Sequence, residues 1–218
     1  MKADLHIHSN FSNDGKSTVE EIIAAAVEKG LGCIAITDHN SFAAYELVKD
    51  NGKVIAIPGE EVSSKEGHIL AFGIDREIPR GMSIKETIDA IHEAGGVAFA
   101  AHPYRWWSGL GEDNTLGNDF DGTEARNGRC TASSNKKAEA LAARIGKPVT
   151  AGSDAHTPEH IGEGTVELPD EIATWEEALK AVMEGKAKPS SNNRKAVSTI
   201  KYGTKSIVEW ILRGFKKM

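Results

Sequence analysis

The segment Asp4-Leu5-His6-Ile7-His8 carries two imidazoles spaced two residues apart. Side chains alternate between the two faces of a β-strand, so Asp4, His6 and His8 are predicted on one face, and Leu5 and Ile7 on the other. Two imidazoles on one face are half of a metal site. A single His-x-His pair arises easily by chance in a chain with 8 histidines, so the pair indicates a metal centre only if further ligands accompany it.

Further candidate ligands follow short apolar runs along the chain. Together with the first pair they make nine residues: His6, His8, Asp14, His39, Glu61, His68, His102, Asp154 and His156. One zinc ion takes about three or four protein ligands, so nine mixed histidines and carboxylates predict two or three divalent ions. Such a centre suits hydrolysis, because a water bridging two ions becomes hydroxide near neutral pH while the ions neutralise phosphoryl oxygens. These ligands suit Mn, Zn or Fe without selecting one of them.

The elements that must position these residues alternate between short apolar runs and helical patterns. Strands are expected over residues 4–8, 32–37, 54–57, 68–74, 97–101, 121–125 and 148–151. Ser17 with Glu20 and Ser83 with Glu86 resemble capping boxes, and Asn135 and Thr174 are predicted to begin two later helices. The alternation predicts an α/β fold with a mainly parallel sheet closed into a compact β/α barrel, with an open doubly wound sheet as the alternative. In a barrel, the carboxyl ends of the strands share one rim, where the candidate ligands would converge.

Composition predicts one domain with a distinct basic end. No apolar stretch approaches 18 residues and there are only 2 cysteines, so we expect a soluble, cytoplasmic protein. Residues 186–218 hold nine Lys and Arg against one Glu, whereas residues 1–185 hold 17 against 31 acidic residues. We expect a domain over residues 1–190 and a basic extension over residues 191–218, helical and docked on the domain or on a second copy in a homo-oligomer. Binding of this extension to a membrane surface or to nucleic acid is the rarer alternative.

The ordered motifs resemble those of the PHP (polymerase and histidinol phosphatase) superfamily over about residues 3–160. The matching segments are Asp4-Leu5-His6-Ile7-His8-Ser9, Asn13-Asp14-Gly15, Thr37-Asp38-His39, Pro58-Gly59-Glu60-Glu61-Val62-Ser63, His68-Ile69-Leu70, Ala101-His102-Pro103 and Gly152-Ser153-Asp154-Ala155-His156. The resemblance implies a distorted (β/α)7 barrel with a two- or three-metal phosphoesterase centre. It assigns His6, His8, Glu61 and Asp154 to one ion, Glu61, His68 and His102 to a second, and Asp14, His39 and His156 to a third. Glu61 would bridge the first two ions, although a one-residue slip of the strand would present Glu60 instead.

Residues around the ligands receive supporting roles. Many small phosphoesterases of this kind have Gly-Arg after His-Pro, whereas this chain has Tyr104-Arg105 followed by Trp106-Trp107. Arg105 and Ser153 are predicted to contact the substrate, with Arg105 and Asp154 acting in catalysis. Asp38 and Asp4 are expected behind the ligands, accepting the second N–H of an imidazole.

Several residues keep two interpretations. Trp106 and Trp107 either stack on a base or sugar or pack within their loop, and Arg126 and Arg129 either reach substrate or are solvated. Glu124 either faces the ligands or forms a salt bridge elsewhere. His92 and His160 are expected outside the site.

The predicted function is metal-dependent hydrolysis of a phosphoester in a small phosphorylated metabolite or nucleotide. The alternatives are a histidinol-phosphate phosphatase, a 3'-5' exonuclease, and a metal-binding regulatory module without activity. All nine ligand positions are filled, which argues against loss of activity.

Overall fold

The structure is a computed structural model of the 218-residue chain, and it describes residues 1–191. The predicted basic extension therefore lies almost entirely outside the described residues. The strands are β1 (Lys2–Ile7), β2 (Leu31–Ile36), β3 (Ile55–Ala56), β4 (Gly59–Ser63), β5 (His68–Phe72), β6 (Val97–Ala100), β7 (Gly122–Asn127), β8 (Val149–Gly152), β9 (Gly164–Glu167) and β10 (Lys188–Ser191). The helices are α1 (Val19–Glu28), α2 (Ala43–Val48), α3 (Ile84–Glu93), α4 (Gly111–Leu116), α5 (Ala132–Ile145) and α6 (Trp175–Met183), with a 3-10 turn at Pro158–His160.

The strands form two five-stranded sheets, in the orders β10-β9-β1-β2-β3 and β4-β5-β6-β7-β8. The fold is mixed α/β, but the described strands do not close into the predicted (β/α)7 barrel. The expectation of a mainly parallel sheet is also wrong, because β4, β5 and β6 pair antiparallel, as do β1, β9 and β10. Only four residues separate β4 from β5, which is too few for the crossover that a parallel pair needs.

The two sheets meet at the ends of their strands. Isolated bridges join Ile7 to Ala155 and His39 to Glu61. A glycine makes the first approach possible: a Cβ on Gly152, at the end of β8, would lie 2.2 Å from the Cβ of His6. The last residues of β1 and β8 therefore lie against each other, next to the first predicted ligand.

The side-chain alternation predicted for β1 is interrupted. Its pairing with β2 shifts register between Asp4 and Ile7. Leu5 packs in one apolar cluster with Phe72 and Phe99, whereas Ile7 packs in another with α1. Asp4 and His6 consequently face different surroundings, because a bulge changes which residues share a face.

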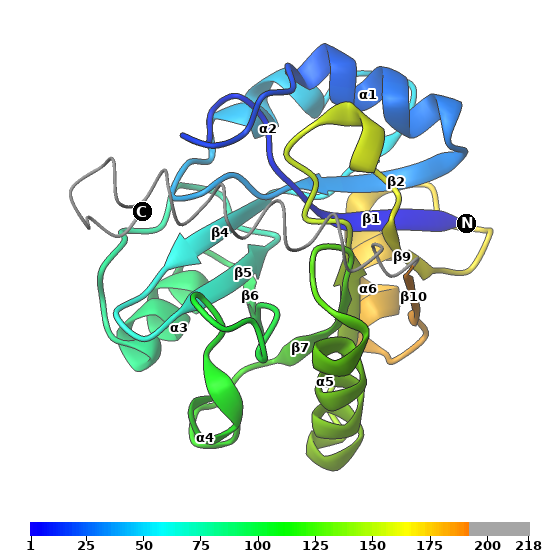
Figure 1. The fold of residues 1–218 in the computed structure, drawn as a ribbon. Coiled ribbons are helices and arrows are strands. Elements are labelled where there is room, and N and C mark those ends of the chain that lie inside the picture. The colour runs from blue at the N-terminus through cyan, green and yellow to red at the C-terminus, as the bar shows by residue number, and fades with distance from the viewer. Residues whose placement is uncertain (192–218) are drawn as a thin grey trace.

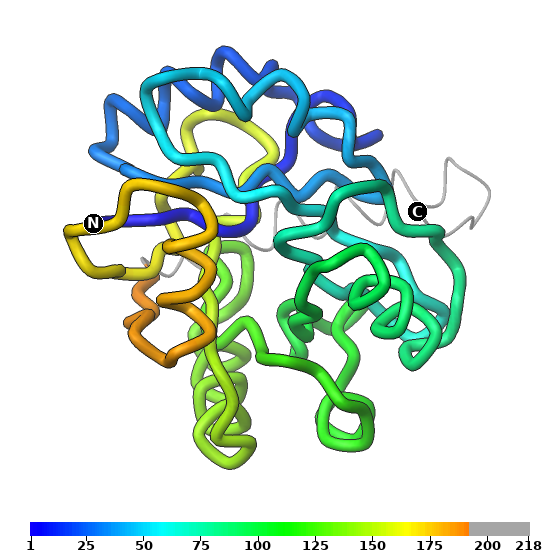
Figure 2. Tube along the Cα trace, turned by 180° about the vertical axis from the view of Figure 1, so that it is seen from behind, coloured from blue at the N-terminus to red at the C-terminus, as the bar shows by residue number. Residues whose placement is uncertain are grey.

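Helices cover the outer sides of the sheets (Figure 1), and α6 lies close to the beginning of β1 when seen from behind (Figure 2). The caps of α3 and α6 are Ser83 and Thr174, as predicted. The cap of α1 is Thr18 rather than Ser17. Helix α5 begins earlier than predicted, after Thr131. No described helix is long and apolar enough to cross a membrane.

Asn135 is not a helix cap but a link between α5 and β7. Its side-chain oxygen accepts a hydrogen bond from the Asn127 amide at 3.0 Å, and its nitrogen donates to the Asn127 carbonyl at 3.0 Å. The end of β7, which carries residues of the candidate site, is thereby held to the helix.

Candidate metal centre

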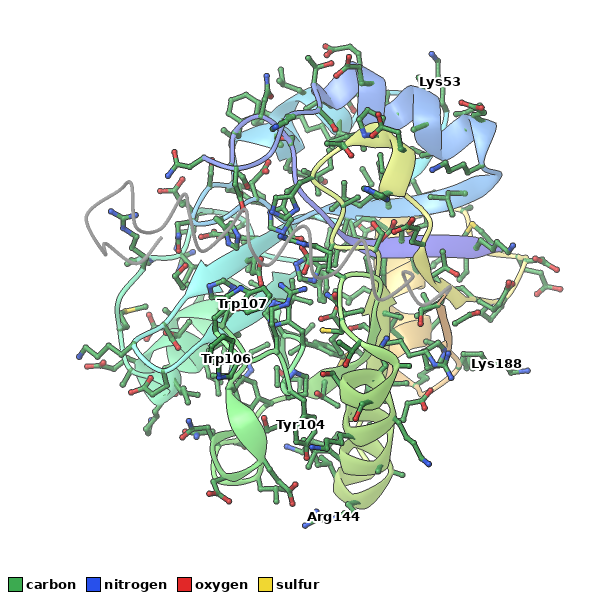
Figure 3. The ribbon with its side chains drawn as sticks, viewed as in Figure 1. Lys53, Tyr104, Trp106, Trp107, Arg144 and Lys188 are labelled. Atoms are coloured by element: carbon green, nitrogen blue, oxygen red, sulfur yellow. The ribbon has the colours of Figure 1, made fainter. Side chains whose placement is uncertain are left out.

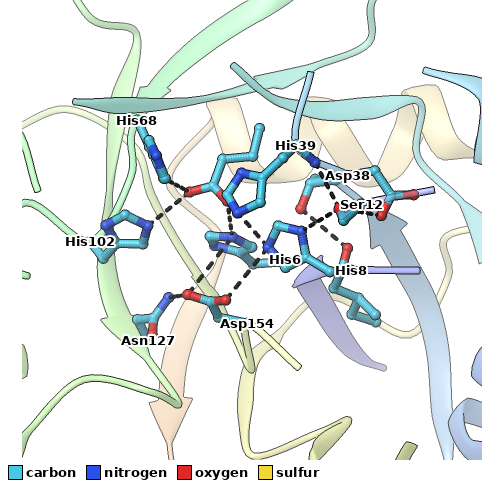
Figure 4. A network of polar contacts seen from close by, with 12 residues as sticks. His6, His8, Ser12, Asp38, His39, His68, His102, Asn127 and Asp154 are labelled. Atoms are coloured by element: carbon cyan, nitrogen blue, oxygen red, sulfur yellow. Dashed lines mark hydrogen bonds and ion pairs between the residues drawn. The ribbon is translucent and has the colours of Figure 1, made fainter. Parts of the chain in front are cut away.

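The structure brings the nine sequence-predicted ligands together where the two sheets meet. His6 is in β1 and Glu61 is in β4, whereas the others follow β1, β2, β6 and β8 or begin β5. His68 is the first residue of β5 and reaches the same end because that strand runs antiparallel to β4. Figure 4 shows six of these side chains, from both sheets, pointing toward one another.

Glu61 lies at the centre of the group, and both of its carboxylate oxygens face imidazoles. Five histidine nitrogens surround it: His6 Nε2, His8 Nε2 and His39 Nδ1, each 3.2 Å from Oε2, and His68 Nδ1 and His102 Nε2, each 2.8 Å from Oε1. The neighbouring Glu60 points away and accepts a hydrogen bond from the Ile78 amide at 2.9 Å. One carboxylate thus spans two sets of imidazoles, the position that a bridging ligand requires.

Asp154 is the second buried carboxylate of the group. Its oxygens lie 3.5 Å from His8 Nε2 and 4.0 Å from His6 Nε2. Arg105 donates a hydrogen bond to Oδ2, and Arg129 donates to Oδ1 at 3.1 Å. Although burial would raise the pKa of Asp154, Arg105 and His6 hold it well below its usual range.

His156 and Asp14 form a pair at the edge of the group. His156 Nε2 lies 2.8 Å from Asp14 Oδ2, and the ring centres of His156 and His8 are 4.3 Å apart. Burial would raise the pKa of Asp14, but His156 and His39 lower it. The aspartate is therefore ionised and faces the other ligands.

Four sets of three ligand atoms lie within 4.8 Å of one another. They are His8, His39 and His156; His6, His102 and Asp154; His6, His8 and Glu61; and His39, Glu61 and His68. This grouping differs from the assignment of ligands to ions that the family resemblance implies. His39 also approaches Glu61, and Asp154 lies in one set with His102. Each predicted ion nevertheless has at least two of its assigned ligands in one set.

Six of the nine ligands have a buried nitrogen or oxygen atom without a hydrogen-bond partner in the described part of the chain. These atoms are His6 Nε2, His8 Nε2, Asp14 Oδ1, His39 Nδ1, Glu61 Oε2 and His102 Nδ1. Leaving one buried polar group unsatisfied costs about 1–3 kcal/mol. Buried lone pairs that lie close together suit divalent cations, because one cation would accept electron pairs from several ligand atoms at once.

The imidazoles have opposite pKa shifts. Burial lowers the pKa of His102 and of His156 to about 4, helped by the adjacent guanidinium groups. Burial alone would also lower the pKa of His8, but Asp154 and Glu61 raise it to about 9. Neutral imidazole is the form that binds metal, so His102 and His156 are already in the binding form at neutral pH.

Asp38 supports the group through a serine. It accepts hydrogen bonds from Ser9 N and from Ser12 Oγ, each at 2.7 Å, and Ser12 Oγ lies 3.1 Å from His8 Nδ1. Ser12 also accepts a bond from the His39 amide at 2.9 Å. The prediction that Asp38 contacts an imidazole is therefore wrong, because Ser12 lies between them. Ser12 was not predicted from the sequence, because its role between Asp38 and His8 depends on tertiary contacts.

Asp4 does not contact an imidazole either. It accepts hydrogen bonds from the amides of Ser153 and Gly162, each at 2.8 Å, and burial raises its pKa to about 6. The pairing of β1 with β2 shifts register after Asp4, and the Asp4 side chain faces these loops. Ser153 is fully buried, and its hydroxyl accepts a hydrogen bond from the Ala155 amide at 3.2 Å. The structure thus places Ser153 within the turn that carries Asp154.

Glu124 faces the group. Its Oε1 atom lies 3.0 Å from His6 Nδ1, and its Oε2 atom accepts a hydrogen bond from the His102 amide at 2.8 Å. Asn127, also missed from the sequence, donates to Glu124 and Asp154 at 3.1 Å and accepts a bond from Arg105 at 2.8 Å. The sequence held no signal for it, because residues three apart in a regular strand point to opposite faces, and the pairing of β7 with β8 shifts register between Glu124 and Arg126. Both side chains orient residues that face Glu61.

Two residues of the group have a left-handed backbone. The φ of His102 is 25° and that of Asp154 is 51°. Non-glycine residues held there store about 1–3 kcal/mol of strain each, and such strain gathers at functional sites.

The other candidate residues lie either at the metal-ligand group or away from it. Arg129 contacts the group, whereas Arg126 pairs with Glu139 on α5. His92 lies 2.7 Å from Asp121, and His160 lies 2.9 Å from Glu163, both away from Glu61. A cleft of about 300 Å³, lined in part by Phe11, His39 and Arg80, adjoins the group.

Fold and site together define a mixed α/β protein with a buried cluster of histidines and carboxylates suited to divalent metals. Comparison with known families makes this specific: the PHP domain family matches residues 4–99, and the PHP-associated family matches residues 132–187. The chain belongs to the PHP family.

Known sequences and solved structures are similar to this chain. An uncharacterized protein of Methanocaldococcus jannaschii is 39% identical over 141 residues, covering 58% of this chain and 82% of the relative. Phosphoribosyl 1,2-cyclic phosphate 1,2-diphosphodiesterase of Eggerthella lenta is 32% identical over 88 residues, covering 36% of this chain and 33% of that enzyme. The crystal structure of a Bacteroides vulgatus two-domain protein, containing a predicted PHP-like metal-dependent phosphoesterase, superposes with a TM-score of 0.72 at 17% identity. That likeness covers 88% of this chain and 65% of the other.

Proposed function

We propose that this protein is a metal-dependent hydrolase that cleaves the phosphoester bond of a small phosphorylated metabolite or nucleotide. The observation that carries the proposal is the arrangement around Glu61, where five imidazole nitrogens face the two oxygens of one buried carboxylate. Membership in the PHP family and the similarity to the Eggerthella lenta phosphodiesterase support phosphoester chemistry.

The nine residues would hold two or three divalent ions, of which Mn, Zn and Fe suit the mixed nitrogen and oxygen donors. When bound, such ions would acidify a water molecule and neutralise the charge on phosphoryl oxygens. Glu61 is suited to bridge, because both oxygens face imidazoles and its pKa lies well below the usual range. Burial opposes that ionisation, and the imidazoles of His68 and His6 outweigh it.

The guanidinium groups would hold the phosphate. Arg105 and Arg129 approach the same carboxylate, Asp154, from its two oxygens. A guanidinium group is a planar fork of N–H donors whose geometry matches phosphate oxygens. Together they would orient the phosphorus atom for attack and offset negative charge as the ester bond breaks.

The test combines metal analysis with an activity screen. The purified chain should contain metal, lose hydrolysis of phosphomonoesters or phosphodiesters after chelation, and regain it with Mn²⁺, Zn²⁺ or Fe²⁺. His8→Ala should lose both metal and activity, whereas the matched variant His92→Ala should keep them, because the His92 side chain pairs with Asp121, away from the site. Full activity after chelation or in His8→Ala would overturn the proposal. Stoichiometric metal without activity on any phosphoester would favour the regulatory alternative.

A further inference from the structure

Two neighbouring indoles are displayed on the surface next to the metal-ligand group. Trp106 is 86% exposed and Trp107 is 55% exposed. Figure 3 shows them side by side above helix α4, on the loop that joins β6 to α4. Large apolar side chains in contact with water mark binding surfaces when they gather in one place. The exposed fraction of Trp106 excludes loop packing as its role.

The loop that carries the indoles is fixed to two of the proposed ligands. The Arg105 amide donates to the His102 carbonyl at 2.8 Å, and the His68 amide donates to the Ser108 carbonyl at 3.1 Å. The Gly109 amide closes the loop on the Arg105 carbonyl at 2.9 Å. A Cβ at position 109 would lie 2.6 Å from that carbonyl oxygen, so the turn requires glycine. The backbone of the loop that carries the indoles therefore has a defined position relative to the metal-ligand group.

Arg105 connects the indoles to the group. Its Cζ lies 6.0 Å from the centre of the Trp107 ring, within the range of a cation–π contact. The same guanidinium donates a hydrogen bond to Asp154. A phosphate held by this guanidinium would place its attached organic group next to Trp107.

We propose that Trp106 and Trp107 form a platform on which an unpaired nucleobase stacks while the phosphate of the same nucleotide occupies the metal-ligand group. This inference rests on the proposed function and narrows its substrate to nucleotides or the ends of single-stranded nucleic acids. A flat, exposed aromatic surface binds any nucleobase through its π-face, with little dependence on sequence. The two tryptophans lie between the segments that match the two families, residues 4–99 and 132–187, so the family match does not assign this role.

Paired probes that differ only in the base test the platform by binding, without turnover. Isothermal titration of the unaltered, metal-loaded protein, with each 5'-phosphate replaced by a non-hydrolysable 5'-methylenephosphonate, compares AMP with ribose 5-phosphate, and a (dA)5 strand with an abasic strand of equal length. One stacked base is worth about a 5- to 100-fold difference in Kd, so AMP should bind that much more tightly than ribose 5-phosphate. A further gain for (dA)5 over AMP would assign both indoles to successive bases of a strand, and equal binding would assign a single nucleotide.

The variants are made in the same background. Trp106→Ala with Trp107→Ala should abolish the preference for AMP, and Trp106→Phe with Trp107→Phe should restore most of it. Leu47→Ala, which removes an exposed apolar side chain from α2, should change nothing. Equal binding of AMP and ribose 5-phosphate, or a preference that survives the double alanine variant, would overturn the platform. If the base preference depends on the indoles but the unaltered protein hydrolyses no phosphoester, the platform stands and the proposed function falls.

Discussion

Glu60 and Glu61 are adjacent in β4 and equally buried, yet their surroundings are opposite. Glu61 faces five imidazoles, and these hold its pKa well below the usual range against the cost of burial. Glu60 faces the segment after β5, where the Ile78 amide donates to one oxygen and the other oxygen has no partner among the described residues. Burial raises the pKa of Glu60 to about 8.

The comparison shows that burial alone does not set the charge of a carboxylate. Alternation along the strand separates two neighbours by the full thickness of the sheet. On one side, the imidazoles of His68 and His6 offset the desolvation of the ionised group. On the other side a single hydrogen bond does not, so the neutral acid predominates at pH 7. The ionised Glu61 is suited to bind cations, and the neutral Glu60 accepts a hydrogen bond from the backbone of Ile78.

The largest expected effect comes from neutralising each carboxylate in turn. Glu61→Gln should lower kcat/KM for a phosphoester by about 1,000-fold or more, because a bridging ligand matters more than the outer partners whose loss costs about 10- to 100-fold. Glu60→Gln should keep activity within about threefold. Steady-state kinetics with metal analysis of both variants checks this pair. Similar losses in the two would mean that Glu60 also serves the metal centre.

The second prediction concerns stability and pH. The pKa of Glu60 in the folded state, about 8, lies above the ordinary value of 4.5. The folded protein therefore binds more protons than the unfolded chain between these values, and the free energy of unfolding should fall as pH rises from about 4.5 to 8. Glutamine mimics the protonated form, so Glu60→Gln should be close to the unaltered protein in stability at pH 5 and exceed it at pH 9 by on the order of 4 kcal/mol.

Urea unfolding at the two pH values measures this difference. The matched variant is Glu46→Gln, because Glu46 is an exposed residue of α2 that pairs with Lys49. An equal gain in both variants would assign the effect to net charge instead of to the buried acid.

The nine candidate ligands could be predicted from the sequence because they lie next to apolar runs, and the ends of strands are easy to recognise. Whether the strands close into a barrel could not be predicted in the same way. The expected strands ended at residue 57 and resumed at residue 68, with none over 59–63, which hid the short antiparallel hairpin of β4 and β5 and led to the expectation of a parallel barrel. The four-residue connection was the available signal.

The supporting residues were harder to predict because their roles depend on tertiary contacts. Asp38 and Asp4 were placed behind imidazoles from their spacing, but Ser12 separates Asp38 from His8, and a bulge redirects Asp4. Neither the intervening hydroxyl nor the register shift has a local pattern in the chain. Glu124 was left between two interpretations for the same reason, and only its contact with His6 decides.

Ser12 offers a smaller test on the Glu61 side of the comparison. Ser12→Ala should weaken metal binding by about tenfold, because His8 loses the partner of its Nδ1 atom while Asp38 keeps its bonds to Ser9. Competition with a chelator measures the affinity. Ser133→Ala, on the exposed face of α5, is the matched control and should have no effect. An unchanged affinity in Ser12→Ala would show that the hydroxyl only fills space.

The contrast between an inward and an outward side chain recurs at the end of β7, where the smallest effect is expected. Arg126 pairs with Glu139, and both side chains are about one-third exposed. Arg126→Ala should therefore lower the free energy of unfolding by less than about 1 kcal/mol and leave kcat/KM unchanged, because exposed ion pairs contribute little. Arg129→Ala should instead lower kcat/KM about tenfold, since Arg129 contacts Asp154 and His156. Equal kinetic effects in the two variants would show that the orientation of the arginine does not matter, and the contrast drawn from β4 would not extend to β7.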